Sequence, residues 1–153
     1  MLRTYSPQGG LWSHAVAANA FPLTPARLVG DHAGMKPLRL WQTEEFKKWL
    51  GGLAPQTRKR IERRVGIAAL GHFGDHHGVK GADEVSEMRL DFGPGYRIYY
   101  HVMADDLILL LLAGGDKSTQ KRDIARAGKM LPGAVAGVKQ ALEEEKRHAQ
   151  TGK

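Results

Sequence analysis

Seven consecutive apolar residues, Leu107 to Ala113, are the feature that most constrains the fold of this chain. The run has the length of one strand and falls far short of the roughly 20 apolar residues that cross a membrane. Successive side chains of a strand point to opposite faces of its sheet, so a strand that is apolar throughout must be covered on both faces. We therefore expect a covered central strand at this position.

The residues before this run have the pattern of a β-hairpin. Polar and apolar side chains alternate over 85–92, the segment 96–103 is also strand-like, and Gly93-Pro94-Gly95 lies between them. Proline presets φ for a turn and glycine accepts positive φ, so these three residues predict the turn. In a hairpin with this loop, Phe92 pairs with Tyr96.

This register predicts which side chains share a face of the sheet. Six polar or aromatic side chains lie on one face as three cross-strand pairs: Asp91 with Arg97, Arg89 with Tyr99, and Glu87 with His101. The other face carries four apolar or aromatic side chains: Met88, Leu90, Ile98 and Tyr100. A slip of one residue would move one arm's set to the opposite face.

Two helices are predicted ahead of the hairpin. Thr43 is a candidate N-cap, followed by acidic residues in the first turn, where the helix dipole favours carboxylates. Apolar residues then recur with helical spacing at Phe46, Trp49, Leu50 and Leu53. Gly51-Gly52 and Pro55 end this helix and begin a second over about 55–70, whose inward side chains are Ile61, Val65, Ala68 and Ala69.

The predicted fold is an α+β domain with the order β-α-α-β-β-β-α. A short strand at 38–41 precedes the helices, residues 71–82 form a glycine-rich loop, and a last helix starts at Ser118. Gly114-Gly115 is interpreted as a turn. Runs of strands and helices in this order favour a small antiparallel sheet that carries the two N-terminal helices and a C-terminal helix.

Three regions are expected along the chain. Residues 1–34 show no periodicity and directly precede Met35, so we interpret them as a disordered extension or an upstream misread of the start. Residues 35–131 hold the patterned domain, and residues 132–153 form a polar helical tail.

Composition narrows the chemistry. The net charge is +7 with histidine neutral, and residues 36–130 carry 17 basic against 12 acidic side chains, which favours an anionic partner. No cysteine is present, so disulfides, thiolate catalysis and cysteine-ligated metals are excluded. We expect a protein of the cytoplasm that uses no cofactor and no metal.

The polar face of the hairpin carries the candidate site. Two guanidiniums, a phenol, an imidazole and a carboxylate are the groups that metal-free RNA transesterification requires: a base, an acid and cations for the phosphorane. The candidates are Arg97, Arg89, Glu87, Tyr99 and His101, with Lys117 just beyond the central strand. A solvated face with cross-strand ion pairs is the competing interpretation.

Two other clusters have plainer interpretations. His72, Asp75, His76 and His77 lack the spacing of a metal site and favour a solvated loop. The basic residues after Pro55 form either a solvated helix face or a surface for phosphates or an acidic partner. The candidate RNA-binding residues are Lys59, Arg63, Arg64, Lys80, Lys121 and Arg122.

Four separated motifs carry a resemblance to a known family. They are Glu45-Phe46-Lys47-Lys48-Trp49-Leu50, Gly71-His72-Phe73-Gly74-Asp75, the stretch from Glu87 to Tyr100, and Gly114-Gly115-Asp116-Lys117-Ser118-Thr119-Gln120 with Asp123-Ile124. In this order and spacing the chain, over roughly 36–131, resembles the addiction-module killer proteins, the HigB-like toxins of the RelE/ParE superfamily.

This resemblance implies the toxin of a type II toxin–antitoxin module. It implies a RelE/ParE-like fold, a small cognate antitoxin with a helix-turn-helix, and cleavage of mRNA on the ribosome. It matches Arg97 to the arginine that such toxins use on phosphate and Lys117 to a second basic residue, while Arg89 and Glu87 lie on the strand that supplies a catalytic group. The alternative is a ParE-like protein that inhibits DNA gyrase by binding.

One position departs from the pattern of the resemblance. RelE-type toxins can carry a tyrosine in the last helix, where this chain has Asp123. The acid–base pair is therefore expected among Tyr99, His101 and Glu87.

Overall fold

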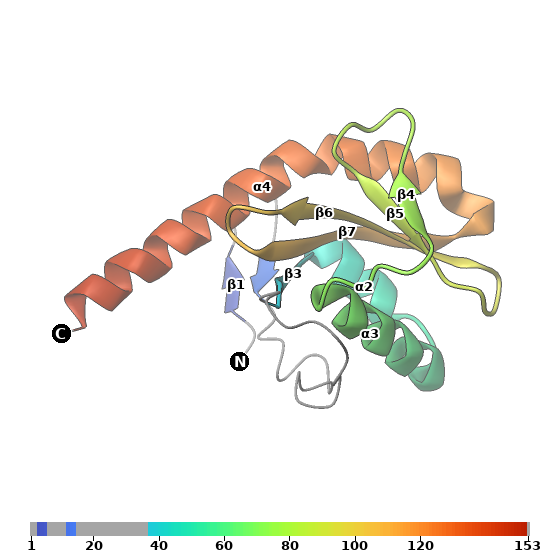
Figure 1. The fold of residues 1–153 in the computed structure, drawn as a ribbon, viewed down its shortest axis with the longest axis horizontal. Coiled ribbons are helices and arrows are strands. Elements are labelled where there is room, and N and C mark those ends of the chain that lie inside the picture. Colours follow the sequence, from blue (N-terminus) through green and yellow to red (C-terminus); the bar gives the residue numbers. More distant parts are fainter. Residues whose placement is uncertain (1–2, 6–11, 15–36, 153) are drawn as a thin grey trace.

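The computed structural model describes residues 3–5, 12–14 and 37–152 (Figure 1). Most of the predicted N-terminal extension lies outside these residues, and its expected disorder stays a prediction. The described strands form one sheet in the order β1-β2-β3-β7-β6-β5-β4. Their bounds are β1 Arg3–Tyr5, β2 Trp12–His14, β3 Arg39–Thr43, β4 His76–Gly78, β5 Ser86–Arg89, β6 Tyr96–Met103 and β7 Ile108–Asp116.

The described helices lie close to the ranges that the patterns predicted. They are α2 Glu44–Gly51, α3 Pro55–Ala69, a 3-10 turn at Lys117–Thr119, and α4 Gln120–Thr151. The two early helices follow strand β3, so they do not begin the domain. Thr43 is the N-cap, because its hydroxyl accepts the Phe46 backbone N–H at 3.0 Å and donates to the Leu112 carbonyl at 2.6 Å.

The sheet is mixed, which corrects the expected antiparallel sheet. Strand β3 pairs in parallel with β7, while β6 pairs antiparallel with the other edge of β7. A parallel neighbour requires a long connection, and α2, α3 and the strands β4 to β6 supply it here. Residues 108–113 of the apolar run therefore lie in a central strand between β3 and β6, as predicted, while Leu107 precedes the strand and is exposed.

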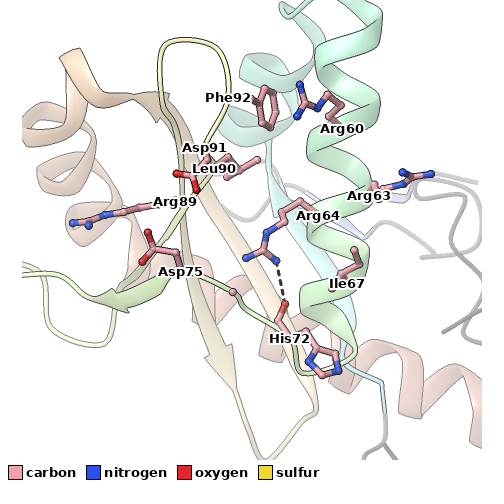
Figure 2. A pocket seen from close by; sticks show the side chains of 11 residues that line it. Arg60, Arg63, Arg64, Ile67, His72, Asp75, Arg89, Leu90, Asp91 and Phe92 are labelled. Carbon is pink, nitrogen blue, oxygen red and sulfur yellow. Dashed lines mark hydrogen bonds between the residues drawn. The ribbon is translucent and has the colours of Figure 1, made fainter. Parts of the chain in front are cut away.

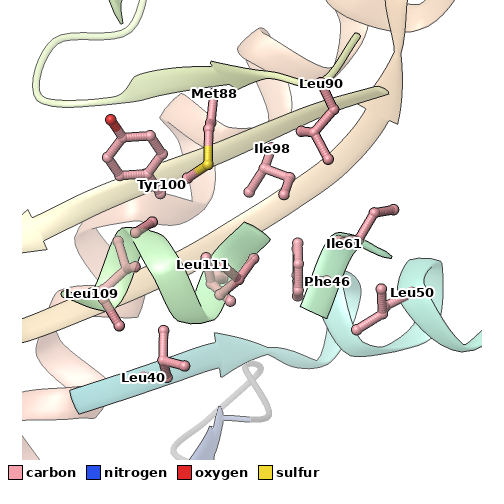
Figure 3. Packing of buried hydrophobic residues seen from close by; sticks show 13 residues of the cluster. Leu40, Phe46, Leu50, Ile61, Met88, Leu90, Ile98, Tyr100, Leu109 and Leu111 are labelled. Carbon is pink, nitrogen blue, oxygen red and sulfur yellow. The ribbon is translucent and has the colours of Figure 1, made fainter. Parts of the chain in front are cut away.

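Two cores cover the two faces of β7. Side chains of α2 and α3 pack with Leu109 and Leu111 on one face (Figure 3). Ala127, Leu131 and other side chains of α4 pack with Leu110 and Leu112 on the opposite face. Figure 1 shows α4 on one side of the sheet and α2 and α3 on the other.

Gly114 and Gly115 lie inside strand β7, which corrects their interpretation as a turn. A Cβ at Gly114 would come within 2.0 Å of the Trp49 ring, and one at Gly115 within 1.9 Å of the Asp123 carboxylate. Because helices approach the strand from both faces here, neither position has room for a side chain.

The hairpin has the predicted faces but a different register. Arg89 pairs with Arg97 and Glu87 with Tyr99, two residues away from the prediction, and the Leu90 N–H donates to the Tyr96 carbonyl. The loop therefore spans Asp91 to Gly95, with Gly93 and Gly95 at φ of 57° and 80°. A shift of two residues keeps every side chain on its face, since strand side chains alternate with a period of two.

Helix α4 runs without interruption through Pro132, so the boundary expected between Leu131 and the tail falls inside one helix. Proline has no N–H to donate to the carbonyl four residues earlier, which favours a bend, and Figure 1 shows α4 curving across the sheet and extending past it. No helix in the described ranges combines the length and the apolar character needed to span a membrane.

Candidate active site

The carboxylate of Glu87 is the centre of a charged cluster on the α4 side of the sheet. Its side chain is 0 % exposed, and its Oε1 lies 3.0 Å from Arg89 Nε and 3.7 Å from Arg97 Nε. His77 Nε2 lies 3.4 Å from the same oxygen, while Gln120 Nε2 donates to Oε2 at 2.7 Å. We call these five residues the Glu87 cluster. A solvated face with simple cross-strand pairs does not describe it, because α4 covers its central carboxylate.

The Glu87 cluster combines residues from four elements. Strand β5 supplies Glu87 and Arg89, β6 supplies Arg97, β4 supplies His77 and the first turn of α4 supplies Gln120. The arginine side chains differ in exposure: Arg89 is 39 % exposed and Arg97 is 12 % exposed. Two guanidiniums face one carboxylate, so the cluster keeps a positive charge that an anion can offset.

The turn at Gly95 brings Arg97 and Lys117 close together. A Cβ at Gly95 would lie 3.6 Å from Lys117 Cβ and 3.7 Å from Arg97 Nη1. Arg97 Nη1 also donates to the Tyr96 carbonyl at 3.2 Å, which orients the guanidinium. Lys117 is exposed at the start of the 3-10 turn, so the predicted pair of cations is assembled at one end of β6 and β7.

Tyr99 lies beneath the Glu87 cluster rather than at its surface. Its side chain is completely buried, and its hydroxyl has no hydrogen-bond partner of ordinary geometry among the described residues. Burial raises the pKa of the phenol well above its ordinary value, and the Glu87 carboxylate raises it further. The phenol therefore keeps its proton at neutral pH and cannot act as a base.

Asp123 has a structural environment. It is buried, accepts a hydrogen bond from the Thr119 hydroxyl at 2.5 Å, and lies 3.6 Å from Arg126. Arg126 in turn pairs with Glu45 of α2 at 3.0 Å. The Asp123 carboxylate, at the position where the family pattern can have a tyrosine, thus connects the start of α4 to the rest of the domain.

His101 is separated from the other candidates. Its Nδ1 lies 2.8 Å from the Glu84 carbonyl, and the two-residue shift places Glu87 opposite Tyr99 instead of His101. The expected contact between Glu87 and His101 is therefore wrong.

The sequence patterns missed two members of the Glu87 cluster. His77 belongs to the predicted loop 71–82, but three of its residues form strand β4, which pairs His77 with Glu87. Gln120 contacts a residue 33 positions earlier in the chain. A three-residue edge strand shows too little alternation to be recognised, although the adjacent histidines were a visible signal.

The candidate RNA-binding residues lie in three separate places. Lys121 and Arg122 line a shallow hollow in the first turn of α4, beside Gln120. Lys59, Arg63 and Arg64 lie on α3, which packs on the opposite face of the sheet, and Lys80 follows β4. Arg64 bonds the carbonyls of His72 and Phe73, which ties α3 to the following loop.

A groove of about 610 Å³ lies between α3 and the segments around Asp75 and Asp91 (Figure 2). The Arg60 guanidinium stacks over the Phe92 ring at 3.7 Å from its centroid. Figure 2 shows Arg64 reaching from α3 toward this space, while the Arg89 guanidinium points away from α3. The lining carries four arginines against two aspartates, so the groove is also net positive, and Arg89 belongs to both the groove and the Glu87 cluster.

The charge state of Glu87 predicts a pH dependence of stability. Burial raises the pKa of Glu87, but hydrogen bonds from Gln120 and Arg89 and the nearby His77 outweigh it and hold the pKa below its usual range. A depressed folded-state pKa contributes stability above the unfolded value of about 4.3, and this contribution is lost as pH falls through the folded value. At pH 7, the urea unfolding midpoint of wild type should therefore lie above that of Glu87→Gln. The gap between the two midpoints should narrow below about pH 4. A gap that widens on acidification would contradict this assignment.

Comparison with known proteins gives a relative without an assigned function. No protein-family model matches the chain. A Haemophilus influenzae protein, described only as uncharacterized, is 36% identical over 91 residues, which cover 59% of this chain and 89% of the relative. The chain belongs to the same family as this protein.

A solved structure gives a weaker likeness. A double arginine-to-alanine mutant of the E. coli toxin RelE in the free state has a TM-score of 0.47 and 17% identity, over 60% of this chain and 95% of the RelE chain. A likeness at this level carries no assignment of function, so the function is argued from the residues of the site.

Proposed function

We propose that this protein is the toxin of a type II toxin–antitoxin module and cleaves mRNA on the ribosome without a metal ion. Two observations favour this function: the HigB-like motifs in the sequence, and the Glu87 cluster, to which those motifs contribute every residue except His77. The reaction is an attack of the ribose 2′-oxygen on the neighbouring phosphorus, with departure of the 5′-oxygen.

The observation that carries the proposal is the arrangement of two arginines around one buried carboxylate. Glu87 contacts Arg89 and Arg97 together, at 3.0 Å and 3.7 Å. A guanidinium that is held in place loses little freedom when it binds a phosphate, and preorganised cations are the main source of stabilisation for a phosphorane. Glu87 is thus a positioning residue in this proposal.

Exposure argues against a purely structural ion cluster. The Arg89 side chain is 39 % exposed. Lys117 is also exposed; it lies near Arg97 and makes no ion pair with any described residue. In the proposed complex, Arg97 and Arg89 bind the oxygens of the scissile phosphate and Lys117 assists them. Tyr99 takes no part in proton transfer in this proposal, because its buried phenol keeps its proton.

The proposed partners follow from charge and from the resemblance. Ribosome-bound mRNA is the substrate, and the basic side chains outside the cluster contact RNA: Lys59, Arg63, Lys80, Lys121 and Arg122. A small antitoxin with a helix-turn-helix neutralises the protein in the cytoplasm, and no cofactor takes part.

Induced expression with transcript mapping tests the function. Mapping of transcript 5′ ends should show cuts within translated regions, while plasmid supercoiling by gyrase stays unchanged. Intact messages together with inhibited supercoiling would replace the proposal by gyrase inhibition. Normal growth with neither effect would exclude both activities.

A further inference from the structure

His77 occupies a position that proton transfer requires. Strand β4 at the sheet edge pairs it directly with Glu87, and its side chain is 39 % exposed. Its Nε2 lies 3.4 Å from Glu87 Oε1 and 3.3 Å from Arg89 Nη2, while Nδ1 makes no hydrogen bond to a described residue. One ring nitrogen is thus held by the cluster and the other has no partner in the described part of the chain.

The other titratable candidates are less suited to this task. Glu87 and Tyr99 are completely buried, and His101 is bonded to a carbonyl away from the cluster. Arginine does not release its proton in proteins, so Arg89 and Arg97 cannot act as acids. Among the described side chains that contact Glu87, His77 alone combines exposure with a ring that can both donate and accept a proton.

Both protonation states of His77 have a partner in the cluster. In the protonated ring, and in the neutral ring that keeps its proton on Nε2, Nε2–H donates to Glu87 Oε1; in the other neutral tautomer, Nε2 can accept a hydrogen bond from Arg89 Nη2. Because Glu87 is a carboxylate at neutral pH, it can accept the hydrogen bond from Nε2–H, while Nδ1 has no hydrogen-bond partner in the described part of the chain. The ring can therefore change charge without rearrangement of its neighbours.

We infer that His77 is the general acid of the proposed RNA cleavage, an inference that rests on the proposed function. The 2′-oxygen forms a bond to phosphorus and releases its proton to water. The bond from phosphorus to the 5′-oxygen breaks, and that oxygen takes the Nδ1 proton of His77. The products are a 2′,3′-cyclic phosphate, a 5′-hydroxyl and neutral His77.

A change of leaving group tests this role. A short message bound to ribosomes is cleaved under single-turnover conditions. The message is either normal RNA or RNA with a sulfur in place of the bridging 5′-oxygen at the cleavage site. A thiolate leaves without protonation, so it removes the need for a general acid. His77→Gln should slow cleavage of normal RNA by about 10²–10⁴-fold and restore nearly the wild-type rate on the sulfur substrate. His76→Gln is the matched control, since His76 is the exposed neighbour on the same strand and bonds the Gly74 carbonyl.

The outcomes separate the inference from the function on which it rests. A wild-type rate for His77→Gln on normal RNA overturns the inference alone, and so does an equal loss on both substrates, which would make His77 a positioning residue. Failure of the wild-type protein to cleave either substrate overturns the proposed function together with the inference. His77→Ala provides a second variant, whose rate on normal RNA should rise with added imidazole.

Discussion

Replacement of Glu87 by alanine is expected to lower the free energy of unfolding by on the order of 3–5 kcal/mol. The carboxylate is completely buried and accepts from Gln120 and Arg89, with Arg97 at 3.7 Å. Its removal leaves the 12 % exposed Arg97 without its opposite charge and Gln120 without its acceptor. Loss of one partner of a buried pair costs more than the pair contributes, because the remaining charge stays desolvated.

Chemical denaturation at pH 7 measures this loss. The control is Glu143→Ala, whose carboxylate pairs with Lys146 at 3.2 Å on an exposed face of α4 and should change stability by about 0.5 kcal/mol or less. Equal effects of the two substitutions would show that the Glu87 cluster is solvated and would contradict its description as a buried network.

Replacement of Gly114 by alanine is expected to destabilise the protein by about 2–3 kcal/mol or more. The added Cβ would lie 2.0–2.3 Å from ring atoms of Trp49. The indole cannot move aside easily, because Phe46 and Tyr96 pack against it with ring centroids at 5.6 Å and 6.2 Å. Strand β7 and helix α2 must therefore separate, which disturbs the sheet next to Arg97.

Gly133→Ala is the matched control for this substitution. Gly133 lies inside α4 with open space where the alanine Cβ would be placed, so alanine should stabilise the helix by roughly 0.5–1 kcal/mol. A thermal unfolding midpoint of Gly114→Ala equal to that of wild type would contradict the close approach of Trp49 to β7.

Local patterns predicted the elements well where one physical cause dominates. The apolar stripe of α2, the N-cap at Thr43 and the doubly covered strand β7 all follow from side-chain periodicity and capping. The face shared by Glu87, Arg89, Arg97 and Tyr99 was also predicted, because a register shift of two residues leaves faces unchanged. The residue pairs between β5 and β6 were predicted incorrectly, because the loop has five residues instead of three.

The remainder of the candidate site depends on contacts that no local pattern contains. Gln120 reaches Glu87 only because α4 begins on the face of the sheet that carries Glu87, and His77 does so only because a three-residue strand forms at the sheet edge. Gly114 and Gly115 have the local character of a turn, yet helix packing from both sides places them in a strand. Tertiary packing, rather than propensity, determines these positions.

Cleavage of a ribosome-bound message by purified protein tests the central claim most directly, with wild type compared with Arg97→Ala. Lys139→Ala, an exposed cation elsewhere on α4, is the control for loss of one positive charge. Wild type and the control should cut the message and leave a 2′,3′-cyclic phosphate, while Arg97→Ala should lose at least about 10²-fold in rate. Cleavage by Arg97→Ala at the wild-type rate, or products that end in a 3′-hydroxyl, would contradict the assignment of the Glu87 cluster as a metal-independent ribonuclease site.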